Sequence, residues 1–108
     1  MEAMDDLEQL ADEHAAKAAV SPHGRSAHLV LHYGALRQTV IALTAGTTMS
    51  EHDAPKAASL QVLRGRISLT TSAGPQELKA DHLHRIPPQR HGLLAHEDSV
   101  VLLTTVTY

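Results

Sequence analysis

Histidine is the residue type through which this sequence could do chemistry. Nine of the 108 residues are histidine, far above ordinary usage, and cysteine is absent. Imidazole is the commonest metal ligand in proteins and titrates near neutral pH, whereas the lack of cysteine excludes disulfides, thiolate ligands and a cysteine nucleophile. His82 and His84 alternate along a predicted strand and therefore share one of its faces, and His28 and His32 share a face of another. The question is which of these imidazoles the fold brings together.

A helix is predicted near the start of the chain. It runs from about Asp5 to Val20, and Asp5 or Asp6 can cap its first turn. Ser21-Pro22 ends it, because the residue before a proline is disfavoured in the helical conformation. The apolar residues of this helix recur at spacings of three and four: Leu7, Leu10, Ala11, Ala15 and Ala18. Since this stripe is thin and rich in alanine, we expect the helix to pack on the rest of the domain or on a second subunit.

Short strands separated by turn residues are predicted from about Ala27 onward. Many short and closely spaced strands are typical of a β-sandwich or a β-barrel. We therefore expect a helical extension at residues 1–22 and an all-β domain at residues 23–108. The predicted strands are His28–Tyr33, Leu36–Thr44, Leu60–Arg64, Ile67–Thr71, Gln76–Lys79, His82–Ile86, Gly92–Ala95 and Ser99–Thr107.

Two segments of the predicted β domain contain histidines in a recognisable pattern. The first is Gly46-Thr-Thr-Met-Ser-Glu-His52, which continues to Leu60-Gln-Val-Leu-Arg-Gly65. The second is Ala80-Asp-His-Leu-His-Arg-Ile-Pro-Pro-Gln-Arg-His91, which continues through Glu97-Asp-Ser-Val-Val-Leu-Leu103. Together they resemble the two motifs of the cupin superfamily, over about residues 36–106. The resemblance implies a double-stranded β-helix, or jelly-roll barrel, with a pocket at its mouth. It also implies a homodimer, often formed by exchange of an edge strand.

The resemblance further implies a metal site, of which this sequence keeps only a part. In the family, three histidines and a carboxylate point into the barrel and form a facial site with open positions for substrate or oxygen. His52 matches the first histidine of the pattern and His91 the last, whereas Ala54 and Ala58 stand where the second histidine and the glutamate are expected. Mononuclear sites normally have three or four protein ligands. The expected cofactor is therefore a divalent transition metal (Fe, Mn, Zn, Ni or Cu) that is held weakly or is absent.

Other side chains are candidates for completing this site. His82 and His84 would lie near His91 if their shared face is the barrel interior, and would otherwise face solvent or a dimer interface. Asp53 follows His52 directly and could turn inward. The candidate additional ligands are His84, His82, His28 and Gln61, although an odd offset from Ala58 puts Gln61 on the opposite face of a regular strand.

Several other polar residues are predicted to be solvated. His14 lies on the helix, His23 follows it, and His96 precedes an acidic turn, so all three are expected at the surface. Arg64 and Arg66 flank Gly65 at a predicted hairpin tip, where charge is typical of a solvated turn.

Composition excludes several classes of function. The formal charge is −3 and the only aromatic residues are Tyr33 and Tyr108, so neither a basic surface nor a set of base-stacking platforms for nucleic acid is expected. No apolar run approaches the roughly 20 residues that span a bilayer, and the acidic start lacks the layout of a signal peptide. A cytoplasmic location without membrane contact is expected. No Gly-x-Ser-x-Gly motif supports a serine nucleophile.

Three functions of different classes remain open. The first is a cupin that binds a small molecule in its barrel and has a degenerate metal site. The second is a metal-dependent enzyme, an oxygenase or isomerase, whose ligand set is completed by another histidine or by water. The third is a structural or regulatory dimer. The sequence names neither substrate nor reaction, because one fold hosts many chemistries.

Overall fold

The computed structural model describes residues 4–52, 57–86 and 91–107, with the backbone alone at residues 51 and 52. This part of the chain contains the helix α1 (Leu7–Val20) and nine strands. The helix is too short and too polar to cross a membrane, and the described residues contain no other. The strands are β1 (Arg25–Tyr33), β2 (Leu36–Leu43), β3 (Thr48–His52), β4 (Ala57–Arg64), β5 (Arg66–Thr71), β6 (Gly74–Lys79), β7 (Leu83–Arg85), β8 (His91–Ala95) and β9 (Ser99–Val106).

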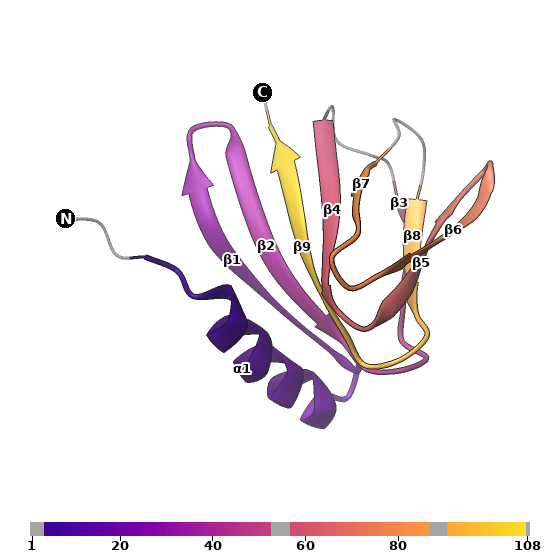
Figure 1. Cartoon of the computed structure of the whole chain (residues 1–108), viewed down its shortest axis with the longest axis horizontal. Helices are drawn as coiled ribbons and strands as arrows, with labels where there is room; N and C mark the ends of the chain where they lie inside the picture. The colour runs from indigo at the N-terminus through magenta and orange to yellow at the C-terminus, as the bar shows by residue number, and fades with distance from the viewer. Residues whose placement is uncertain (1–3, 53–56, 87–90, 108) are drawn as a thin grey trace.

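Two antiparallel sheets face each other and form a jelly-roll barrel (Figure 1). One sheet has the strand order β1-β2-β9-β4-β7 and the other has the order β3-β8-β5-β6. The predicted all-β jelly roll with a short N-terminal helix is confirmed. The eight predicted strands are all present, but β3 was not predicted, because Thr48–His52 contains Met49 as its only apolar residue.

Large aliphatic side chains fill the space between the two sheets. Ile67 and Leu69 of one sheet meet Leu43, Leu60 and other residues of the facing sheet, and each of these four is at most 1% exposed. Burial of a Leu, Ile or Val side chain stabilises the fold by about 1.5–3 kcal/mol. This inner core consists of Ile41, Leu43, Leu60, Val62, Ile67, Leu69, Leu78, Ile86, Leu93, Ala95 and Val101.

A second apolar layer lies on the outer face of the five-stranded sheet, where α1 packs against β1 and β2 (Figure 1). The Asp6 side chain caps the helix by accepting hydrogen bonds from the backbone amides of Glu8 and Gln9. The layer itself is made of small residues from the helix and mostly larger ones from the sheet: Ala11, Ala18, Val40, Ala42, Val100 and Leu102.

Two of the residues predicted to be solvated hold this helix in place. His14 is only 5% exposed, because the helix turns it toward the sheet, and its Nδ1 atom lies 2.7 Å from Ser26 Oγ. Arg64 reaches from the end of β4 to the helix, where it forms an ion pair of 2.7 Å with Asp12 and donates a hydrogen bond to the carbonyl oxygen of Glu8. The prediction that His14 is a surface residue was therefore wrong, and Arg64 is more than a solvated turn residue.

Candidate functional site

His91 lines a small apolar cavity inside the barrel. It stands at the start of β8, where alternation of the strand points it inward together with Leu93, and it is 4% exposed. The cavity has a volume of about 40 Å³, and the other described residues that line it are aliphatic or Met: Ile41, Met49, Leu60, Leu69, Ile86, Leu93 and Leu103. The imidazole is the polar group among these described lining residues, and an imidazole nitrogen can hydrogen-bond a polar atom of a small guest.

The backbone of His52 in β3 is paired directly with that of His91 in β8. Residues directly opposite each other in an antiparallel pair have neighbouring Cβ atoms on one face of the sheet. This register is the one that the prediction of a shared site requires. The side chain of His52 lies outside the described part of the chain, and so do Asp53 and Ala54.

Among the residues that the structure describes, the donor set around His91 is too small for a mononuclear metal site. Ala58 packs against the inner core, so the position of the expected glutamate does face the barrel interior and carries a methyl group there. Within residues 4–50, 57–86 and 91–107, no three His, Cys, Asp or Glu side chains are grouped so as to hold a metal ion. Since a first-row metal normally needs three or four protein ligands, the described residues do not supply them.

A larger hollow, which we call the vestibule, lies beside the inner cavity. Its volume is about 240 Å³, and Leu69 lines both spaces. His84 of β7, Gln76 of β6 and Thr71 of β5 supply its polar groups, and the backbone of Thr71 is paired directly with that of His91. The Thr71 hydroxyl is bonded within the β5–β6 turn, where it donates to the carbonyl oxygen of Gly74. Sequence reasoning named His84 but missed Thr71 and Gln76, because neither belongs to a recognisable motif.

His82 belongs to a turn and not to the strand with His84, because β7 begins only at Leu83. Its Nδ1 atom accepts a hydrogen bond of 3.2 Å from the backbone amide of Lys79, and its side chain is exposed. The preceding Asp81 has a φ of 71°, in the left-handed region that favours glycine. Asp81 and His82 thus take over the turn where the motif has Gly and Asp, and the Nδ1 atom of His82 is engaged there.

His28 and Gln61 lie on the outer face of the five-stranded sheet. His28 is paired with Val40 and Gln61 with Leu102, and both partners belong to the layer under the helix. Residues opposite each other share a face, so neither side chain points toward His91. A β-bulge between Leu29 and Leu31 turns His32 to the face opposite that of His28, contrary to the regular strand that was predicted.

Comparison with known proteins bears on the fold. No family model and no curated sequence matches the chain. A conserved protein of unknown function from Streptococcus pyogenes is 21% identical, with a TM-score of 0.73 over 82% of this chain and 78% of that one. A cupin-2 domain protein from Shewanella frigidimarina is 11% identical, with a TM-score of 0.72 over 95% of this chain and 94% of that one.

A third similar structure is that of an enzyme. Salicylate 1,2-dioxygenase from Pseudoaminobacter salicylatoxidans, in a mutant form in complex with gentisate, is 15% identical, with a TM-score of 0.77. The match covers 91% of this chain but only 32% of the dioxygenase. At these identities the similarity concerns the fold alone. The chain therefore has the fold of the cupins, in agreement with the two motifs of its sequence.

Proposed function

We propose that this cupin-fold chain binds a small organic molecule at the mouth and in the interior of its barrel, without a resident metal ion. The proposal rests on two features seen together. The imidazole of His91 lines the inner cavity, and Ala58 turns a methyl group toward the core at the position where a carboxylate ligand would stand. The first is a group that recognises a polar atom, and the second removes a ligand that metal chemistry requires.

The sizes of the two spaces limit the ligand. The inner cavity of about 40 Å³ is far below the roughly 150 Å³ that admits benzene, so it takes only a few atoms. The vestibule of about 240 Å³ lies below the roughly 300–1,000 Å³ of pockets for drug-sized molecules. We infer a ligand of metabolite size, with its body against His84 and Gln76 and a narrow end directed past Leu69 toward His91.

Short carboxylates and alcohols test this arrangement. We expect acetate, butyrate and hexanoate, or the matching alcohols, to shift the imidazole NMR signals of His84 and His91 saturably, with tighter binding as the chain lengthens. His84→Gln is expected to weaken binding, whereas the matched control His23→Gln, in the exposed loop after α1, leaves it unchanged. If no member of the series gives a saturable shift at either histidine, the ligand-binding proposal is wrong.

A metal-dependent enzyme is the second candidate, and the register of His52 against His91 favours it. The dioxygenase of similar fold is an example of a cupin-fold enzyme, although this chain spans only a third of its length. Elemental analysis after growth with Fe, Mn, Zn, Ni and Cu separates the two candidates. We expect substoichiometric metal, and a full complement held through dialysis would favour the enzyme instead.

The missing donors can also be restored. The double variant Ala54→His/Ala58→Glu completes the ligand pattern of the motif, and we expect it to bind one divalent metal ion more tightly than the natural chain does. The control Ala54→His/Ser59→Glu places its carboxylate one residue further along β4, so that it points to the opposite face of the strand, and should gain little.

A structural or regulatory dimer is the third candidate. We propose that the chain forms a homodimer, and light scattering of the full chain tests this. We also propose that the protein is cytoplasmic and has no nucleic-acid or membrane partners. If removal of residues 1–22 leaves the oligomer unchanged, the helix does not drive assembly.

A further inference from the structure

A stacked pair of histidines lies between α1 and β1, away from the barrel interior. The ring centroids of His14 and His28 are 5.3 Å apart and their planes are inclined by 18°. His14 is buried in the interface and contacts the Ser26 hydroxyl, whereas His28 is exposed. The ligand site uses neither residue.

The surroundings of His14 disfavour its charged form. Burial lowers the pKa of His14 below its ordinary value of 6.5, the charge of Lys17 lowers it further, Glu13 raises it and His28 lowers it. The described residues that β2 and β9 contribute to the layer under the helix are all apolar: Val40, Ala42, Val100 and Leu102. Of the charged groups on neighbouring elements, Arg64 is paired with Asp12, and Asp98 lines the crevice beside Ala15 and Ala18.

The contact with Ser26 does not depend on protonation. A hydroxyl group can donate to a neutral imidazole nitrogen or accept from a protonated one, so the 2.7 Å contact survives in both states. The cost of protonating His14 therefore comes from burying its charge beside Lys17 and a second imidazole.

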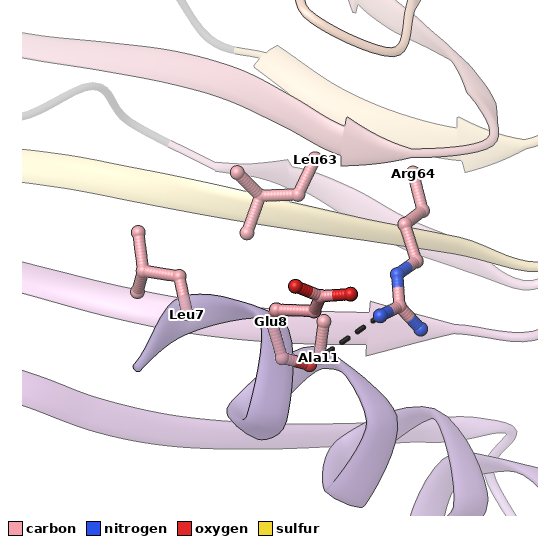
Figure 2. Close-up of a pocket in the computed structure, with 5 residues that line it drawn as sticks. All are labelled: Leu7, Glu8, Ala11, Leu63 and Arg64. Atoms are coloured by element: carbon pink, nitrogen blue, oxygen red, sulfur yellow. Dashed lines mark hydrogen bonds between the residues drawn. The ribbon is translucent and has the colours of Figure 1, made fainter. Parts of the chain in front are cut away.

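The helix that carries His14 contacts the sheet mostly through small or partly buried apolar residues. Its two buried apolar residues are Ala11 and Ala18, which bury little area, and its larger Leu7 and Leu10 are only partly buried. Crevices of about 300 and 160 Å³ lie on the two sides of Arg64, and Figure 2 shows the larger one, between Leu7 and Ala11 of the helix and Leu63 of β4. A third crevice of about 220 Å³ lies under Leu7 on the β1 side. A modest free-energy penalty is enough to shift the docking of such a helix.

We propose that α1 is a pH-released cover, which leaves the sheet when His14 is protonated beside His28 and exposes the apolar strip of Val40, Ala42, Val100 and Leu102. Because the docked state holds His14 at a lowered pKa, docking is at full strength above pH 6.5 and weakens as the pH falls below that value. Between about pH 7.5 and 5.5 a single such histidine changes the docking equilibrium by up to about tenfold.

Hydrogen exchange of the full chain, corrected for the intrinsic effect of pH, tests this release. We expect peptides of α1 to lose up to about tenfold in protection between about pH 7.5 and 5.5, while peptides of β4, β5 and β9 do not change. His14→Gln keeps a partner for Ser26 and cannot titrate, so its helix should stay protected at the lower pH. His23→Gln is the matched control and should behave as the natural chain does.

The proposal is overturned if the helix of the natural chain is equally protected at both pH values, or if His14→Gln loses as much protection as the natural chain. Where His14→Gln fails to dock its helix at all, an NMR titration of His14 in the natural chain decides. A pKa below 6.5 that coincides with helix opening supports the release, and one at or above 6.5 refutes it.

Discussion

The two faces of the five-stranded sheet are covered in different ways. The inner face meets a second sheet through side chains such as Leu60 and Val62, which leave an inner cavity of about 40 Å³ in addition to the vestibule at the mouth of the barrel. The outer face meets one helix through buried alanines and the partly buried Leu7 and Leu10, and crevices of about 160–300 Å³ flank the contact. Protein interiors normally pack at crystal-like density, so the inner face is typical of a core and the outer face is not.

The barrel and the helix therefore differ in how firmly they are held. The barrel holds its shape through large aliphatic contacts, which tolerate little change, whereas the helix is held by small or partly buried apolar residues, a buried histidine and one partly exposed ion pair. A change of charge or pH can therefore alter the docking of the helix while the barrel keeps its structure. Three pairs of substitutions test this difference. The first compares the two faces of the sheet, the second concerns the turn between β4 and β5, and the third concerns the contact of Arg64 with the helix.

The largest effect is expected from the same truncation made on each face. Leu60→Ala removes a side chain that is 1% exposed in the inner core, and should lower the free energy of unfolding by about 3–5 kcal/mol. Leu102→Ala lies beside a crevice on the outer face and should cost about 2 kcal/mol, because its neighbours can relax. Urea denaturation followed by circular dichroism measures both, and equal costs would contradict the comparison.

An intermediate effect is expected at Gly65, between β4 and β5. Its φ is 84°, and a Cβ atom there would collide with Asp98 and Ser99, which precede and begin β9. Gly65→Ala should cost about 2 kcal/mol or more. The control Gly34→Ala also has a positive φ but no atom within 4 Å, and should cost about 1 kcal/mol. Thermal unfolding compares the two variants. Similar decreases in melting temperature would show that the turn between β4 and β5 packs loosely against Asp98 and Ser99.

The smallest effect is expected from Arg64→Gln. Its ion pair with Asp12 is partly exposed, so the loss should be about 0.2–1 kcal/mol. This loss of stability should appear as reduced hydrogen-exchange protection of α1 and of no other element. Arg66→Gln removes a similarly exposed arginine that pairs with Glu77 and Glu97 and not with the helix. If both variants change the protection of α1 equally, Arg64 does not hold the helix.

The sequence predicted the fold more fully than the site. Local patterns are sufficient for the helix with its Asp6 cap and for eight strands, and motif spacing identifies Ala58 as a lost ligand position. The burial of His14 was not predictable, because it depends on how the helix rolls onto the sheet. The vestibule was also missed, because Thr71 and Gln76 belong to one sheet and His84 to the other, so that they meet only where the two sheets face each other.

Gly24 fixes the point about which the helix would move. Its carbonyl oxygen accepts a hydrogen bond of 2.8 Å from the amide of Thr44, and a Cβ atom there would lie 2.5 and 2.6 Å from the hydroxyl oxygens of Thr47 and Thr44. A released helix would thus stay tethered through residues 21–23 only, at a high effective concentration next to its own binding face. Its return would be a unimolecular step, independent of protein concentration, and any competitor for that face would have to overcome this local advantage.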